Sequence, residues 1–426
     1  MGILIIVCSV LSSLIACVLA CVPGLHIYNF MALAAVVLHL LGAQGISLSG
    51  EVIISCAVGM TVAYSLLSNV PSVLVSAPDE SSLFTVLPGQ KFLMKGRGYE
   101  AVIVTASGGV LGLFVLLCIG PFLARKLPMI YEVLRPHSHW ILWCVICFML
   151  MSEWPKGITV GQGGWERFFR GWRSISMGLV TFVLSGLLGF ILMYRSPVSS
   201  KVAFQNLMPA LVGLFALPWL ILNLASSAVI PDQRFGYELS ADELARGGLA
   251  GTLGGGFAAF FPVVTGGVGG LLSGHALAAR NDRVFLVSQG ASKVVYYVGG
   301  LLLFFVPLLN ITRGGGAWTV GGLYVPKGCG DFYVSMSAAA IAGAAAVIMI
   351  HPLTKFAIVL LEKHGYKRMS FISLITALLI VVVLTGWSGI FVSIVALGIG
   401  LLPVVFGSRR MNCLGIILLP MACNMS

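Results

Sequence analysis

The sequence predicts an all-α membrane protein that crosses the bilayer many times. Of its 426 residues, 58% are hydrophobic and only 9% are charged, whereas soluble domains carry about 25% charged residues. The mean hydropathy is +1.03. Apolar stretches of about 20 residues, long enough to span a bilayer as helices, recur along the whole chain. The alternating strands of a membrane β-barrel are not found. We therefore expect a multi-pass protein of the cell membrane with about ten to twelve transmembrane helices.

Charge and cysteine usage exclude several other classes of protein. The net charge of +11 is what positively charged cytoplasmic loops produce, with a smaller contribution that would attract anionic lipid or solute. No basic region lies outside the apolar stretches, so we expect no nucleic-acid partner. The ten cysteines are scattered, and the pair Cys144 and Cys147 lies in an apolar run. Since no spacing typical of zinc ligands occurs, we expect no metal site.

The first span, residues 2–22, ends at a helix break. It lacks the basic start of a signal peptide, so we expect it to stay in the membrane. Pro23 and Gly24 end the helix, and the polar residues His26 and Asn29 follow. Two interpretations remain open, a turn at the membrane interface or a break that faces substrate. These four residues are candidates for substrate binding.

Residues 68–98 predict a re-entrant hairpin between the spans 52–67 and 99–123. Three prolines, at 71, 78 and 88, interrupt a stretch that is too apolar for an exposed loop. Ser76 and Asp79 have the spacing of a capping box, so Asp79 either caps a helix or couples an ion. Glu80 is not needed for such a cap and is the stronger candidate to bind a coupling ion, either Na⁺ or H⁺. Helix N-termini bind anions, which adds Ser76, Pro78 and Ser81 to the substrate-binding candidates.

The chain is expected to form two related halves. Residues 1–153 would form the first membrane repeat and residues 175–426 the second repeat with the C-terminal spans. Between them, residues 154–174 alternate tryptophan and phenylalanine with arginine and lysine. This composition is typical of an amphipathic helix at the membrane interface. Prolines at 209 and 218 would kink the following span, 208–229.

A glycine-rich stretch in the second half resembles the first hairpin in its position. After a polar loop, a helix is expected to begin at Ser240, capped with Glu243. Residues 247–274 then contain eleven glycines. Two interpretations are open, close helix packing or a broken helix that lines a site. The second adds Thr265, Gly266 and Gly267 to the substrate-binding candidates.

Lys293 lies inside the apolar span 284–307, about 15 Å from its charged end at 1.5 Å per residue. A lysine there either reaches back to the interface or is a functional cation, so it is also a substrate-binding candidate. A Gly-Gly-Gly turn at 314–316 and the spans 334–350, 370–387 and 389–406 complete the chain.

No motif for catalysis or nucleotide binding occurs, so we expect no enzyme and no catalytic residues. Broken helices at matching places in two halves favour a secondary transporter with a site near the membrane midplane. The main hypothesis is a permease for a small organic anion such as a carboxylate. The alternatives are a translocase of a lipid-linked phosphate, of the polyprenyl-phosphate type, and a membrane enzyme or scaffold.

The segments PSVLVSAPDESS (71–82) and PGQKFLMKGRGYEA (88–101) resemble the signature of the TctA family, the large permease subunit of tripartite tricarboxylate transporters. The short length and the Pro-Asp-Glu form are similar to archaeal members. Leu286–Gly300 departs from the polar hairpin common in the family. The matching positions are Pro23, Gly24, Pro71, Ser72, Pro78, Pro88, Gly89, Gly96, Arg97, Gly98 and Glu100.

The resemblance implies uptake of carboxylates by secondary active transport, without a cofactor other than a coupling ion. It also implies a small membrane subunit and a solute-binding protein as partners. The sequence leaves a homodimer open.

Overall fold

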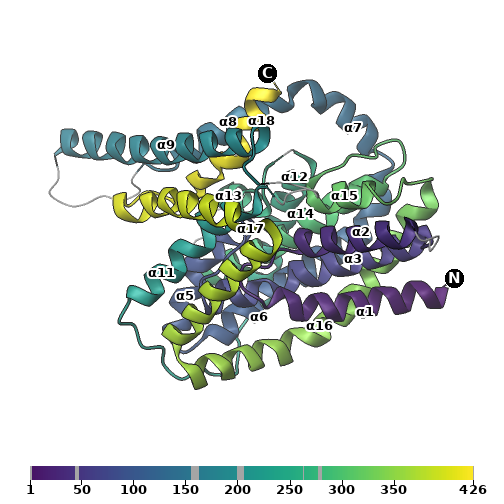
Figure 1. The fold of residues 1–426 in the computed structure, drawn as a ribbon, viewed down its shortest axis with the longest axis horizontal. Coiled ribbons are helices and arrows are strands. Elements are labelled where there is room, and N and C mark those ends of the chain that lie inside the picture. Colours follow the sequence, from purple (N-terminus) through teal and green to yellow (C-terminus); the bar gives the residue numbers. More distant parts are fainter. Residues whose placement is uncertain are drawn as a thin grey trace.

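The computed structural model describes residues 2–43, 48–154, 163–198, 206–261, 263–276 and 281–425. Within these ranges all regular structure is helical (Figure 1). Eight helices are long and apolar enough to cross a membrane, which confirms an all-α polytopic membrane protein. The ten to twelve helices expected from the sequence also included segments in the interior of the protein. Two of these, α12 (Ala241–Phe260) and α14 (Asp282–Phe305), are long but more polar and are not among the eight.

The first half contains the expected interrupted helix. Helix α3 (Gly50–Leu67) continues as α4 (Asn69–Leu74), and residues 75–82 then leave helical geometry. Two short elements follow, η1 (Leu83–Thr85) and α5 (Val86–Leu93). The chain then enters the long helix α6 (Gly98–Ala124). The order is therefore a long helix, a break, a short helix and a second long helix.

The second half repeats this order. Helix α12 ends at Phe260, residues 261 and 263–265 are not helical, and α13 (Gly266–Ala276) leads to α14. Pro262 lies outside the described residues. The predicted start of α12 is confirmed, because the Glu243 N–H donates to Ser240 Oγ at 3.1 Å and the Ser240 N–H donates to Glu243 Oε2 at 3.1 Å. The two capping bonds satisfy backbone donors at the helix end.

Glycines bring the backbones of α6, α12 and α14 into direct contact. A methyl group added at Gly251 of α12 would collide with the Ser288 carbonyl of α14, and one at Gly108 of α6 would collide with the Val287 carbonyl. Such close approach is the usual role of small residues between membrane helices. The glycine-rich stretch thus packs closely and also contains a break, whereas a substrate-binding role of that break stays a prediction.

The remaining helices surround this centre in two groups (Figure 1). On one side, helices near α3 share its buried core: α1 (Gly2–Ala20), α2 (Ile27–Ala43), α15 (Gly314–Gly321) and α16 (Cys329–His364). The others contribute mainly to two further cores or lie beside them: α7 (Leu127–Leu134), η2 (Arg135–His137), α8 (Ser138–Met151), α9 (Gly164–Tyr194), α10 (Met208–Leu211), η3 (Val212–Ala216), α11 (Leu217–Ala225), α17 (Tyr366–Phe406), η4 (Arg410–Leu414) and α18 (Gly415–Asn424).

Several boundaries differ from the prediction. The described part of the 154–174 segment forms the start of the 31-residue helix α9, continuous with the following span, and residues 155–162 lie outside the described ranges. The glycines at 314–316 begin α15 rather than forming a turn. The stretch labelled α17, by contrast, consists of two helices that meet at Gly386, where φ is 67° and ψ is −165°, in agreement with the predicted boundary between the last two spans. The division into two halves with a linker stays a prediction.

Candidate functional site

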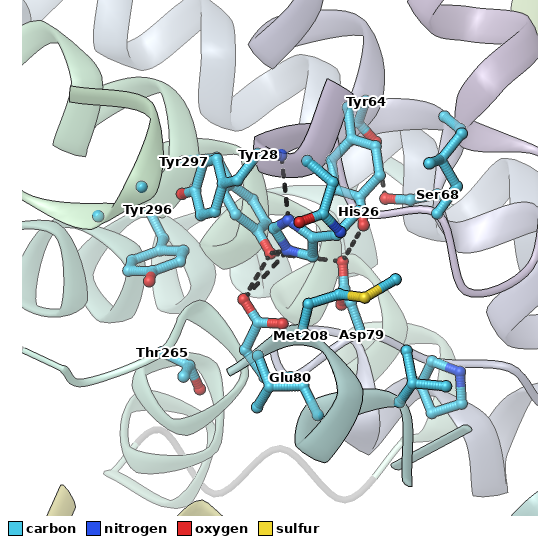
Figure 2. A pocket seen from close by; sticks show the side chains of 18 of the residues that line it. His26, Tyr28, Tyr64, Ser68, Asp79, Glu80, Met208, Thr265, Tyr296 and Tyr297 are labelled. Carbon is cyan, nitrogen blue, oxygen red and sulfur yellow. Dashed lines mark hydrogen bonds and ion pairs between the residues drawn. The ribbon is translucent and has the colours of Figure 1, made fainter. Parts of the chain in front are cut away.

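A cavity of about 160 Å³ lies where the two helix breaks meet (Figure 2). The first break contributes residues 77–80, and the second contributes Phe261, Val263 and Thr265. The turn before α2 supplies a third wall with His26, and the first turn of α2 adds Asn29. The rest of the lining includes aromatic and apolar side chains, among them Tyr28, Tyr64, Met208, Tyr296 and Tyr297. A largely apolar pocket with a few convergent polar groups is the usual form of a small-molecule site.

Asp79 shapes the first break. Its Oδ1 atom accepts from the Ser81 N–H at 3.1 Å, the Ser82 N–H at 2.7 Å and the Ser82 hydroxyl at 2.5 Å. A side chain that binds backbone N–H groups two and three residues ahead fixes a turn. Asp79 is therefore structural in this contact, as one of the two predictions stated, but the predicted capping box is not formed. Ser76 has a φ of 55°, and its hydroxyl lies 3.3 Å from that of Tyr366.

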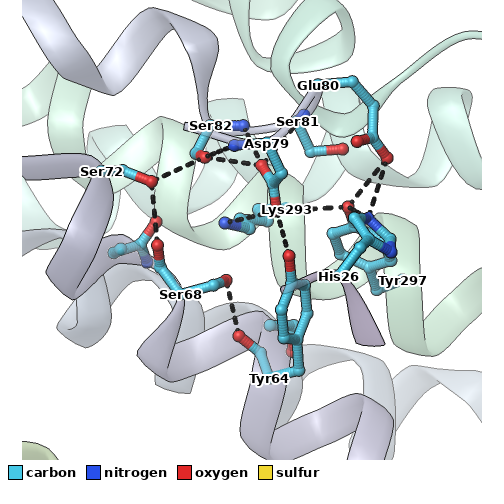
Figure 3. Close-up of polar contacts among 12 residues, drawn as sticks. His26, Tyr64, Ser68, Ser72, Asp79, Glu80, Ser81, Ser82, Lys293 and Tyr297 are labelled. Carbon is cyan, nitrogen blue, oxygen red and sulfur yellow. Dashed lines mark hydrogen bonds and ion pairs between the residues drawn. The ribbon is translucent and has the colours of Figure 1, made fainter. Parts of the chain in front are cut away.

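The second carboxylate oxygen of Asp79 faces a buried lysine (Figure 3). Lys293 Nζ lies 3.2 Å from Asp79 Oδ2, and the lysine side chain is 1% exposed. The hydroxyl of Tyr64 donates to the same oxygen at 3.0 Å. Nζ makes no hydrogen bond of good geometry within the described residues. Lys293 thus does not reach the interface. It neutralises Asp79 from α14, beside the cavity.

Glu80 and His26 form a second polar pair on the cavity wall. The backbone N–H of Tyr28 donates to His26 Nδ1 at 3.3 Å, so a neutral ring carries its proton on Nε2. That Nε2 atom lies 3.3 Å from Glu80 Oε1 and 3.1 Å from the Tyr297 hydroxyl. Tyr297 in turn donates to Glu80 Oε1 at 3.0 Å. The pair therefore joins the α1–α2 turn, the first break and α14 (Figure 3).

At the second break, the start of α13 lies against the first break. The Val268 N–H donates to Thr265 Oγ1 at 3.4 Å, so Thr265 caps this helix. The Ser292 hydroxyl donates to the Gly266 carbonyl at 2.6 Å and holds the helix against α14. A methyl group at Gly267 would stand 2.7 Å from the Ser81 carbonyl. Glycine is required there because the two breaks approach so closely.

The structure separates the predicted substrate-binding candidates into two groups. The cavity is lined by Gly24, His26, Asn29, Pro78 and Thr265, together with the ion-coupling candidates Asp79 and Glu80. The remaining candidates do not line it: Pro23, Ser76, Ser81, Gly266, Gly267 and Lys293. Ser81, Gly266, Gly267 and Lys293 support the lining residues through the contacts given above. Whether any of these residues binds substrate or ion stays a prediction.

Arg313 is a lining residue that the sequence analysis missed. It precedes α15, and its Nε atom is buried without a hydrogen-bond partner among the described residues. No carboxylate of the described residues forms an ion pair with it. The signal was present in the sequence as a single arginine between two apolar segments. Arg313 is half-buried, and a buried N–H without a partner is costly unless something binds it, which makes Arg313 a candidate to bind an anion.

The Gly-Arg-Gly-Tyr-Glu motif at 96–100 lies elsewhere and has a structural role. Glu100, whose side chain is 3% exposed, accepts from Arg97 Nε at 2.6 Å and from Arg97 Nη2 at 2.7 Å. Arg283 Nε at the start of α14 donates to the same carboxylate at 2.9 Å. The Gly98 N–H donates to Gln233 Oε1 at 2.8 Å. The motif therefore ties the start of α6 to the start of α14 and to the loop before α12.

Comparison with known proteins agrees with this architecture. A model of the tripartite tricarboxylate transporter TctA family matches residues 6–415. A protein of Methanocaldococcus jannaschii, described as "Uncharacterized protein MJ1079", is 24% identical over 403 residues, which cover 93% of each chain. This relative is consistent with the predicted archaeal type. No solved structure matches. Since the family match covers nearly the whole chain, the protein belongs to the tripartite tricarboxylate transporter TctA family and is a multi-pass membrane component of a transporter.

Proposed function

We propose that the protein is the permease for a small organic carboxylate, which binds in the cavity between the two helix breaks. The observation that supports this most directly is Arg313, a cavity-lining cation without an ion-pair partner among the described residues. Guanidinium groups bind carboxylates through two parallel hydrogen bonds. The N-terminus of α13, with Thr265 on the cavity wall, adds a partial positive charge suited to a second carboxylate.

The charges around the cavity favour an anion. Asp79 is neutralised by Lys293, and Glu80 accepts a hydrogen bond from Tyr297 and lies 3.3 Å from His26 Nε2. Glu80 stays charged beside a neutral His26, but one of its oxygens already has two polar contacts, whereas Arg313 is the lining cation with no ion-pair partner in the described part of the chain. A carboxylate would satisfy its buried Nε. The family's tripartite character extends the proposal to two further components, a small membrane subunit and a solute-binding protein.

Equilibrium binding to the purified protein tests the proposal without those partners. We expect saturable binding of radiolabelled citrate or succinate, and about 10- to 100-fold weaker binding in Arg313→Gln, since a hydrogen-bonded charge contributes about 1.5–3 kcal/mol. Arg313→Lys keeps the charge but not the two parallel hydrogen bonds, so its affinity should lie between those of the wild type and Arg313→Gln. Arg234→Gln is the matched control, because Arg234 is exposed and lies outside the cavity lining.

The same assay examines the lipid-linked phosphate alternative. Farnesyl phosphate serves as the probe, and binding of farnesyl phosphate without binding of any carboxylate would replace the proposal by that alternative. Carboxylate binding that is unchanged in Arg313→Gln would show that the site lies elsewhere. For a bound carboxylate, counterflow in proteoliposomes then establishes transport.

A further inference from the structure

The two acidic residues of the first break differ in what can still bind to them. Asp79 Oδ1 faces three donors, from Ser81 and Ser82. Asp79 Oδ2 faces the Tyr64 hydroxyl and the ammonium of Lys293. A sodium ion needs oxygen lone pairs around it, as unwound backbone carbonyls provide in other transporters. Because donors already occupy both oxygens, and a fixed cation lies on one of them, Asp79 is closed to a free cation.

Glu80 is open to a proton. Its contacts with His26 Nε2 and with the Tyr297 hydroxyl both go to Oε1. None of the described residues donates to Oε2. The side chain lines the cavity and is 8% exposed, so water in the cavity can reach it. A proton added at Oε2 therefore leaves both the hydrogen bond from Tyr297 and the His26 contact at Oε1 intact.

We propose that the coupling ion is a proton taken up by Glu80, and that Lys293 stands permanently where a sodium ion would otherwise neutralise Asp79. The inference rests on the proposed function of the cavity as an anion site. A proton from water in the cavity adds to Glu80 Oε2, which turns the carboxylate into a neutral carboxylic acid. No other bond forms or breaks, and the reverse step returns the proton to water.

The proton and the anion then favour each other's binding. Protonation of Glu80 raises the net charge at the cavity by one, while Arg313 is already present as an unpaired cation. An anion therefore binds better to the protonated site, and by linkage a bound anion makes protonation easier. The change in the charge of Glu80 acts directly on His26 and Tyr297, because both contact Glu80. The titratable and charged groups that face this pair from the surrounding elements are Tyr28, Tyr64, Asp79, Lys293, Tyr296, Tyr297 and Arg313.

Two measurements on the purified protein test the inference without a substrate. In pH-difference infrared spectra, we expect a protonated-carboxyl band on acidification that is absent in Glu80→Gln and retained in Glu132→Gln, a variant of an exposed glutamate on α7. With radioactive sodium, we expect no saturable binding to the wild type. Saturable sodium binding overturns the proposal, and so does a spectrum that Glu80→Gln leaves unchanged. The sodium measurement needs no variant, so it decides even if Glu80→Gln does not fold.

Calorimetry with citrate or succinate tests the coupling itself. Titrations in two buffers of different ionisation enthalpy count the protons taken up with each anion. We expect uptake approaching one proton per anion in the wild type and none in Glu80→Gln. Where one proton accompanies one anion, affinity should rise by up to about tenfold per unit fall in pH, at pH values where the anion stays fully ionised. Affinity should not respond to sodium.

The outcomes separate the inference from the proposed function. If no carboxylate binds, the proposed function fails, while the infrared and sodium measurements still decide which ion the site takes. If carboxylate binds and its affinity depends on sodium but not on pH, the proposed function stands and proton coupling is wrong.

Discussion

The ion pair between Asp79 and Lys293 gives a prediction whose size follows from the contacts of each partner. Breaking a buried ion pair by removing one partner costs about 3–5 kcal/mol, because the other charge is left uncompensated. After Lys293→Met, Asp79 still accepts from Tyr64, Ser81 and Ser82. After Asp79→Asn, the ammonium of Lys293 has no hydrogen-bond acceptor of good geometry among the described residues. We therefore expect the loss of unfolding free energy to be at the lower end of this range for Lys293→Met and at the upper end for Asp79→Asn.

Equilibrium unfolding in mixed detergent micelles measures these differences. The double variant Asp79→Asn/Lys293→Met should recover much of the loss, since neither of these two positions then carries an uncompensated charge. Lys91→Met is the control, because Lys91 pairs with Asp282 at 3.3 Å on the surface, where the lysine side chain is 62% exposed. Such a pair contributes about 0–1 kcal/mol. Additivity of the two single variants within about 0.5 kcal/mol would refute the reasoning, because it would mean that the two charges do not interact.

Three further predictions concern stability outside the cavity. Gly290→Ala should lower the free energy of unfolding by about 1–3 kcal/mol, because its methyl group would collide with the Thr105 carbonyl. Gly256→Ala is the control, since Gly256 has open space around it and the variant should keep its stability. Equal effects of the two variants in chemical unfolding would contradict the backbone contact. Ser240→Ala should cost about 1 kcal/mol by loss of the helix cap, and an unchanged melting temperature would show that the cap is dispensable. Burial raises the pKa of Glu153 in the folded protein. The folded protein therefore binds this proton more tightly than the unfolded chain does, and the stability gained at low pH is lost as pH rises through the raised pKa. Glu153→Gln should therefore gain in melting temperature relative to the wild type as pH rises above about 4.5, and a constant difference would exclude this linkage.

The breaks and caps could be predicted from the sequence because their signals are local. Prolines in the first half and glycines in the second interrupt apolar stretches, and both stretches are broken in the structure. Ser240 and Glu243 form the predicted capping box. The same pattern at Ser76 and Asp79 does not form a capping box, because the Asp79 side chain instead forms a turn with the residues that follow it.

The composition of the cavity could only be predicted in part, because its walls come from distant parts of the chain. Lys293 was recognised as an unusual cation, but its partner Asp79 lies 214 positions earlier. Nothing local indicates such a pairing. Arg313 was missed because a single arginine in a loop is typical of the membrane surface. The Arg97–Glu100 motif was assigned through a family resemblance alone, and its contact with Arg283 became visible only in three dimensions.

The glycine contacts between α6, α12 and α14 also determine which walls of the cavity can move. Where two backbones touch, no side chains lie between them that could change rotamer, so these helices cannot slide past one another without losing contact along their length. The three helices therefore behave as one stiff body, tied at its end by Glu100 and Arg283. Other lining residues belong to segments whose backbone is irregular. They include the turn at Gly24, with a φ of 79°, and the π-helical turn Val212–Ala216 ahead of Pro218. Opening of the cavity to either side of the membrane should therefore be a displacement of these segments against a rigid centre.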